Sequence, residues 1–123
     1  MNYVNTEKAP AAIGPYSQAL LHNGLVYTSG QIPLDPDTGA VKGITVEEQT
    51  EQVMKNLLAV LEAAGSGADK ILKTTCFLTD MKDFAKFNGV YSKYITGNPA
   101  RSCVAIRELP KSVLVEVEAV AFT

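Results

Sequence analysis

A single long amphipathic helix, predicted between residues 45 and 65, constrains the fold of this chain more than any other feature. Thr45 followed by Glu48 forms a capping box, because each side chain can accept a hydrogen bond from the other residue's backbone N–H. The apolar residues that then recur at helical spacing are Val53, Met54, Leu57, Leu58, Leu61 and Ala64. Gly65 stands where a glycine commonly ends a helix. A helix with one apolar stripe must bury it against another element, and the neighbouring segments are predicted strands.

Strand-like segments lie on both sides of this helix. Asn23-Gly24, between two apolar stretches, is the dipeptide most typical of a tight hairpin turn. The predicted strands are residues 2–6, 16–22, 25–29, 70–79, 101–109 and 113–122, and a second helix is predicted at 83–95. The resulting order, β-β-β-α-β-α-β-β, predicts an α+β fold in which a six-stranded mixed sheet carries two helices on one face.

The last predicted strand has two unlike faces. One face carries Val113, Val115, Val117, Ala119 and Ala121, and the other carries Leu114, Glu116, Glu118, Val120 and Phe122. The first set suits packing beneath helices, whereas the second mixes carboxylates with apolar groups and suits a half-buried surface beside another subunit. Two helices can cover only one face of such a sheet, so we expect oligomerisation to cover the other face.

Charge and composition argue against several classes of protein. The chain has 123 residues, a formal net charge of −2 and no run of Lys or Arg, which argues against a nucleic-acid surface built on phosphate contacts. It has no N-terminal apolar segment and no long apolar run, so neither secretion nor a membrane partner is predicted. Cys76 and Cys103 lack the spacing of a metal or redox pair, which favours a cytoplasmic protein with free thiols. His22, the single histidine, argues against a histidine-based metal site or a Ser/His/Asp triad.

The segment from residue 99 to residue 106 carries the clearest candidate chemistry. Arg101 and Cys103 are two residues apart in a predicted strand, so they share a face. The opposite face carries residues of increasingly apolar character, Ser102, Val104 and Ile106. This alternation predicts that the second set faces the core, while the first presents a guanidinium and a thiol. A planar guanidinium binds a carboxylate through two parallel hydrogen bonds, which predicts a small organic acid as the ligand.

Both residues also have plainer interpretations. Arg101 is equally consistent with an ordinary surface arginine or with an ion pair to Glu116 or Glu118. Cys103 is more typical of a small buried residue than of a nucleophile, because no second histidine or nearby lysine pair would lower its pKa.

Two loop-proximal segments supply further candidates. Tyr16 follows the stiff Gly14-Pro15 pair, so it is placed either to line a pocket or to pack with its hydroxyl in water. Ser29 and Gly30 end a predicted strand, where Gly30 either lets a ligand approach the backbone closely or serves only the turn.

Two polar residues on predicted regular elements are also candidates. Asn88 shares a helix face with Phe84 and Tyr91, and a polar group in an apolar stripe needs a partner from the backbone, water or a ligand. Glu116 is placed to orient a water molecule or to pair with Arg101. No glycine-rich phosphate-binding loop is present in the sequence.

Several of these segments together resemble the RidA (YjgF-like) family of reactive-intermediate deaminases. They are residues 11–18 (AAIGPYSQ), 29–33 (SGQIP), 99–104 (PARSCV) and the turn at 109–111. The resemblance covers nearly the whole chain and implies a single RidA-like domain over residues 1–123 with a chorismate-mutase-like fold. It also implies a homotrimer with ligand sites between the subunits. The implied reaction is hydrolysis of reactive 2-imino and enamine acids to 2-oxo acids and ammonia, with no cofactor and no metal.

The resemblance also implies roles for individual residues. Arg101 matches the arginine that binds the substrate carboxylate, Cys103 a pocket cysteine that contributes position, and Glu116 the acid that orients water. The matching pocket-lining positions are Tyr16, Ser29, Gly30, Phe84 and Asn88. Residues 105–108 read Ala-Ile-Arg-Glu, where many deaminase-type members read Glu-Val-Ala-Arg, and this departure bears on substrate range.

Two other functions remain open from the sequence. One is a regulatory protein that binds 2-oxo acids or amino-acid metabolites without turnover. The other is a ribonuclease or translation inhibitor, which the lone His22 and the negative net charge disfavour.

Overall fold

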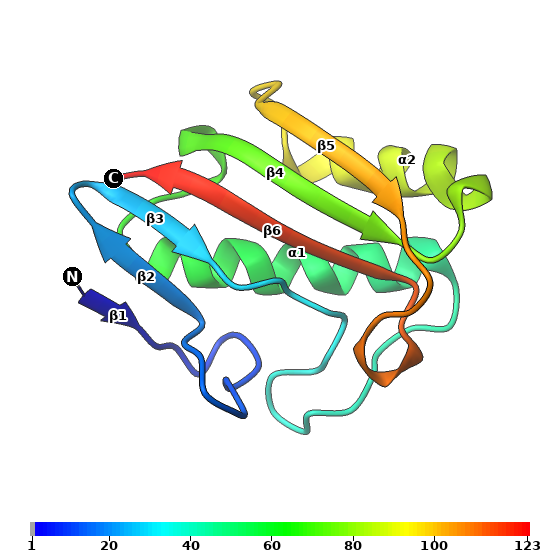
Figure 1. The fold of residues 1–123 in the computed structure, drawn as a ribbon, viewed down its shortest axis with the longest axis horizontal. Helices are drawn as coiled ribbons and strands as arrows, with labels where there is room; N and C mark the ends of the chain where they lie inside the picture. Colours follow the sequence, from blue (N-terminus) through cyan, green and yellow to red (C-terminus); the bar gives the residue numbers. More distant parts are fainter. Residues whose placement is uncertain (1) are drawn as a thin grey trace.

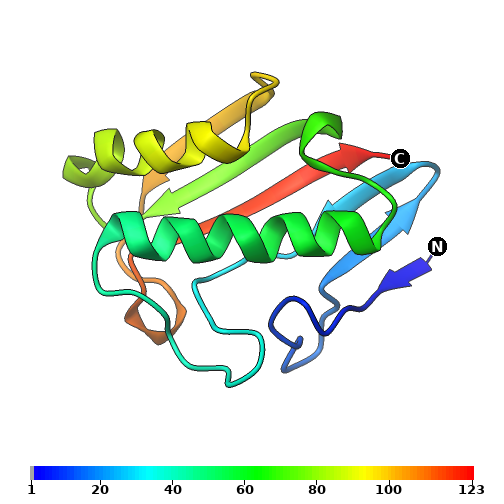
Figure 2. The same ribbon diagram turned by 180° about the vertical axis from the view of Figure 1, so that it is seen from behind.

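Six strands form one mixed sheet in the order β1-β2-β3-β6-β4-β5 in the computed structural model, which describes residues 2–123. The elements in chain order are β1 (Asn2–Val4), β2 (Ala19–His22), β3 (Leu25–Thr28), α1 (Val46–Ala63), β4 (Ile71–Leu78), α2 (Phe84–Tyr94), β5 (Ala100–Ala105) and β6 (Val115–Phe122). Only β4 and β5 run parallel, and the other neighbours are antiparallel. Figures 1 and 2 show both helices against the same face of the sheet, so the predicted α+β fold is confirmed.

The local signals at the ends of α1 act as predicted. The Glu48 backbone N–H donates to Thr45 Oγ1 and the Thr45 N–H donates to Glu48 Oε1, which is a complete capping box. The backbone N–H groups of Thr45 and Ile44, which both donate to the Glu48 carboxylate, lower the pKa of Glu48. At the other end Gly65 has a φ of +83°, and the N–H groups of Gly65 and Ser66 donate to the carbonyls of Glu62 and Leu61. This pair of bonds is the Schellman arrangement, which explains why a glycine follows the helix.

All six strands are shorter in the structure than the pattern suggested, and the first, predicted over residues 2–6, ends at Val4. The hairpin strand predicted from residue 16 begins at Ala19, and the Gln18 side chain before it bonds to the preceding loop. The strand predicted to residue 109 ends at Ala105, after which the chain turns away from the sheet. The strand predicted from residue 113 begins at Val115.

The two faces of the sheet differ as the alternation along the last strand predicted. Val115, Val117, Ala119 and Ala121 are buried beneath the helices, whereas Glu116, Glu118 and Val120 lie half-buried on the other face. No helix covers that second face, which we call the bare face and which is toward the viewer in Figure 1. Tyr27 and Val104 are exposed there. Among residues 2–123 no helix is both long enough and apolar enough to cross a membrane.

The orientation predicted for β5 is wrong. Arg101 lies in register with Thr74, and Cys103 with Cys76, and both partners are buried on the helix-covered face. Val104 therefore lies on the bare face, where 44% of its surface is exposed. Apolar alternation fails here because β5 is an edge strand, and the long stem of an arginine can cover apolar surface as well as a smaller side chain does.

Buried amide side chains hold the loops around the sheet. Gln18 Nε2 donates to the carbonyls of Thr6 and Pro10, and the Thr6 N–H donates to Gln18 Oε1. Asn56, on α1, donates through Nδ2 to the carbonyls of Ile32 and Leu34. Since a buried carbonyl without a partner is costly, these amides fix the loops that surround the candidate site.

Candidate functional site

Arg101 is held against α2 by three uncharged groups. Its Nη1 donates to Asn88 Oδ1 at 2.7 Å, and its guanidinium carbon lies 4.9 Å from the ring centre of Tyr91 and 5.4 Å from that of Phe84. None of these partners neutralises the positive charge, so an incoming anion can do so. A pocket of about 320 Å³ opens beside the guanidinium, lined by Asn88 and Tyr91 among others. The structure thus brings together three of the predicted site residues, Arg101, Asn88 and Phe84.

Cys103 lies two residues further along β5, on the same face as Arg101, and is partly buried. Burial raises the pKa of the Cys103 thiol, although the nearby Arg101 acts in the opposite direction. Its register partner Cys76 is fully buried, and burial raises the pKa of that thiol to about 12. A thiolate is the reactive form of cysteine, so this environment suits a packing or positioning role better than nucleophilic attack.

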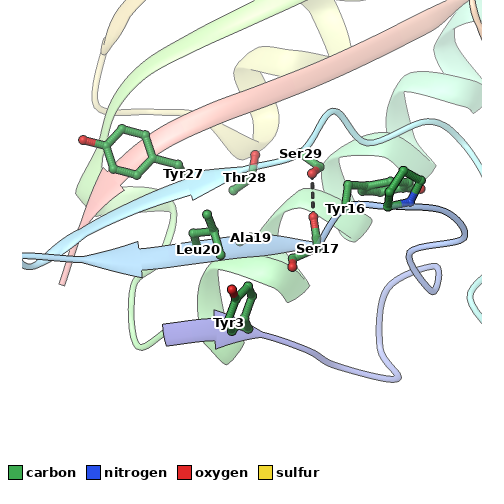
Figure 3. A pocket seen from close by; sticks show the side chains of 9 residues that line it. Tyr3, Tyr16, Ser17, Ala19, Leu20, Tyr27, Thr28 and Ser29 are labelled. Atoms are coloured by element: carbon green, nitrogen blue, oxygen red, sulfur yellow. Dashed lines mark hydrogen bonds between the residues drawn. The ribbon is translucent and has the colours of Figure 1, made fainter. Parts of the chain in front are cut away.

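Four other predicted residues, Tyr16, Ser29, Gly30 and Glu116, line a separate pocket of about 290 Å³. Ser29 Oγ donates to the Ser17 carbonyl at 2.6 Å, which ties the end of β3 to the segment before β2 (Figure 3). A Cβ atom on Gly30 would lie 2.7 Å from Glu116 Cδ, so only a glycine leaves room for this carboxylate. Burial raises the pKa of Glu116, and the negative charge of Glu118 raises it further.

Arg101 and Glu116 lie on opposite faces of the sheet within one chain. Arg101 is in register with Thr74, whose side chain is buried under α2, whereas Glu116 is opposite Phe77 on the bare face. The ion pair between Arg101 and Glu116 that the sequence left open is therefore absent. The alternative pair with Glu118 is absent for the same reason, since Glu118 shares a face with Glu116. The eight predicted residues form two half-sites rather than one.

A third pocket, of about 480 Å³, adjoins the half-site around Glu116. Tyr3, Leu20 and Tyr27 are register partners on three adjacent strands and line it on the bare face, and it shares Tyr16 and Ser29 with the Glu116 pocket (Figure 3). Side chains suited to metal binding do not gather there or elsewhere: within residues 2–123 no three His, Cys, Asp or Glu residues are placed to hold an ion.

Two residues near Arg101 were missed as site residues by the sequence. Tyr91 was assigned only to the apolar stripe of its helix, and Thr74 only to the strand predicted over residues 70–79. In the structure the Thr74 and Tyr91 hydroxyls lie 2.8 Å apart, and the ring of Tyr91 lies beneath the guanidinium. The only available signal was the spacing of Asn88 and Tyr91 on one helix face, because the pairing with Thr74 depends on how α2 crosses the sheet.

Comparisons with known proteins extend over nearly the whole chain. The model of the family described as Endoribonuclease L-PSP matches residues 6–123. A candidate regulator of Lactococcus lactis, AldR, is 52% identical over 122 residues, covering 98% of this chain and 97% of that protein. The 2-iminobutanoate/2-iminopropanoate deaminase of Salmonella typhimurium is 48% identical over 122 residues, covering 96% of this chain and 94% of that enzyme. The crystal structure of E. coli TdcF with bound serine has a TM-score of 0.94 at 40% identity, covering 100% of this chain and 99% of that one.

Proposed function

Because this chain belongs to the Endoribonuclease L-PSP family, which includes the RidA (YjgF) proteins, we propose that it hydrolyses short 2-imino and enamine acids to 2-oxo acids and ammonia. The observation that carries the proposal is the guanidinium of Arg101, which is held by Asn88 and two aromatic rings and faces a pocket with its charge unneutralised. The expected substrates are 2-iminobutanoate and 2-iminopropanoate with its enamine form, 2-aminoacrylate. The similarity to the Salmonella deaminase supports this choice.

A complete site requires a second copy of the chain. Arg101 and Glu116 are on opposite faces of one sheet, so a ligand that contacts both must lie between subunits. The bare face, with its exposed Tyr27 and Val104, gives a surface for such contacts. The resemblance to the RidA family implies a homotrimer, and we propose that the ligand sites lie in its clefts, with Arg101 of one subunit facing Glu116 of the partner subunit. The free thiols suit a cytoplasmic location.

The proposed mechanism needs only positioning and proton transfer. Arg101 binds the substrate carboxylate in a bidentate manner and so fixes the adjacent imine carbon. Glu116 accepts a proton from a water molecule as the water oxygen adds to this carbon, and it passes that proton to the imine nitrogen, which gives a neutral carbinolamine. Glu116 then takes the proton of the carbinolamine hydroxyl and delivers it to the amino group, so the C–N bond breaks, ammonia leaves and the C=O bond of the 2-oxo acid forms. A raised pKa makes Glu116 a stronger base than an ordinary glutamate.

A coupled assay tests this proposal. A threonine dehydratase generates 2-iminobutanoate while semicarbazide competes for the imine, and the wild-type protein is expected to lower semicarbazone formation. If the protein has no effect but binds 2-oxobutanoate, it is a metabolite-binding regulator, which the similarity to AldR would then explain. If it neither acts on the imine nor binds the 2-oxo acid but cleaves RNA, the proposal is wrong.

Replacing Cys103 should show whether its thiol acts through its position in the site or as a nucleophile. We expect Cys103→Ala to retain kcat within about tenfold of wild type, because a thiol with a raised pKa is a poor nucleophile at neutral pH. Alkylation of Cys103 by iodoacetamide at pH 7 should be slower than that of a free cysteine, as followed by mass spectrometry. A complete loss of turnover in the folded Cys103→Ala protein would instead indicate covalent catalysis.

A further inference from the structure

The ring of Tyr91 forms a rigid support directly beneath the guanidinium of Arg101. We propose that Tyr91, held by Thr74, is a positioning residue that sets the plane of the guanidinium for carboxylate binding. The inference deepens the proposed function and rests on it, because it concerns the same carboxylate-binding arginine. It assigns a role to two residues that neither the sequence nor the comparisons connect with the site.

Thr74 fixes the tyrosine from below. Its side chain is 0% exposed, and it lies in register with Arg101 on the neighbouring strand. Its hydroxyl is 2.8 Å from the Tyr91 hydroxyl, and either group can donate. A buried hydroxyl that loses its partner costs about 1–3 kcal/mol, so the two groups hold each other in place. This bond connects β4 to α2 at the level of the guanidinium.

Packing fixes the tyrosine from the side. The ring centres of Phe87 and Tyr91 are 5.4 Å apart with an interplanar angle of 40°, and Tyr91 is 8% exposed. Burial also raises the pKa of Tyr91, so the ring remains a neutral phenol at physiological pH. The ring therefore has little freedom to follow a moving guanidinium.

The support leaves the guanidinium ready for a ligand. One face lies over the Tyr91 ring, and one N–H of Nη1 is used by Asn88. A guanidinium has five N–H donors in a fixed plane, so the remaining donors are available for a carboxylate. A group that is already ordered loses less freedom on binding, so the support should improve ligand affinity more than the rate of the chemical step.

Three variants of the full chain test the inference. Thr74→Val and Tyr91→Phe each remove one hydroxyl of the pair and keep its size. Tyr94→Phe is the matched control, because Tyr94 lies on the same helix and donates its hydroxyl to Glu51, away from Arg101. Two quantities are measured: the Kd of 2-oxobutanoate by titration calorimetry, and the rotation rate about the Arg101 Cζ–Nη bonds by nitrogen-15 NMR without ligand.

We expect Thr74→Val and Tyr91→Phe to weaken 2-oxobutanoate binding by about three- to tenfold and to accelerate the Arg101 rotation, with KM raised more than kcat. Tyr94→Phe should change neither quantity. The double variant should be no weaker than either single one, since both remove the same bond. If Thr74→Val does not fold, Thr74→Ser keeps the hydroxyl and should match wild type in both measurements.

Two outcomes separate this inference from the proposed function. In the first, wild type binds 2-oxobutanoate, and both variants have the same affinity and the same Arg101 rotation rate as wild type. This result overturns the positioning role and leaves the proposed function standing. Absence of imine hydrolysis by wild type, with weaker 2-oxobutanoate binding and faster rotation in both variants than in wild type, overturns the proposed function and supports the positioning role.

Discussion

Arg101→Ala is expected to lower kcat/KM for imine hydrolysis by about 10²- to 10³-fold, as measured by semicarbazone competition, because loss of one partner of a desolvated charge pair costs roughly 2–5 kcal/mol. The fold should be unaffected, since Arg101 is exposed and its side chain contacts Asn88, Phe84 and Tyr91 on α2. Arg101→Lys should also lose most of the activity, because an ammonium group cannot form the bidentate contact. Full activity of the lysine variant would contradict the proposed carboxylate clamp.

A mixture of two inactive variants tests where the complete site lies. Arg101→Ala and Glu116→Gln chains, co-expressed and purified together through different tags, should regain roughly a third of wild-type activity. This fraction follows from the cyclic arrangement, because every mixed trimer has one site of its three that combines an intact Arg101 with an intact Glu116 of the partner subunit. If the mixed oligomers have no more activity than their parents, the two residues do not act in one shared site.

The two helices and the order of helices and strands along the chain could be predicted because their signals are local. The capping box of Thr45 and Glu48 and the glycine at position 65 involve residues a few positions apart, and the structure has all of these contacts. The alternation along β6 was equally informative, since a central strand has one face buried under helices. The ends of β2 and β5 were less predictable. Gln18 bonds to a loop and the chain turns after Ala105, and neither feature is visible in the hydrophobic periodicity.

The arrangement of the site depends on non-local geometry. Glu116 lies on β6 and Arg101 on β5, and β4 lies between these two strands, so neighbouring positions in the sheet come from distant parts of the chain. Alternation in β5 predicted the wrong face because that strand is at an edge and Arg101 packs on the rings of α2. The pairing of Thr74 with Tyr91 was invisible for the same reason, since it arises only when α2 crosses β4. Motif resemblance named candidate residues, but it could not say which of them meet within one chain.

Glu116→Gln should remove activity and raise stability in the same protein. Loss of the base is expected to lower kcat by about 10²- to 10⁴-fold, while the similar size of glutamine preserves the contact with Gly30. Burial and Glu118 raise the pKa of Glu116 above its ordinary value of 4.5, so the folded state binds this proton more tightly than the unfolded state. Stability therefore falls as the pH rises from the ordinary value through the raised one, and at pH 7 the ionised carboxylate is destabilising.

Because the substitution is expected to raise stability while it lowers kcat, the effect of Glu116 on stability can be measured separately from its role as a base. Calorimetry should give a higher Tm for Glu116→Gln than for wild type at pH 7, and the difference should shrink below the ordinary pKa of 4.5, where both side chains are uncharged. Glu118→Gln is the matched control, because it removes one cause of the raised pKa and leaves the base in place. Its kcat should stay near wild type while the acidic limb of the pH–rate profile moves to lower pH. A Glu116→Gln protein that is less stable than wild type at pH 7 would mean that the carboxylate forms a stabilising contact in the assembled oligomer, and the raised pKa would then not describe the working site.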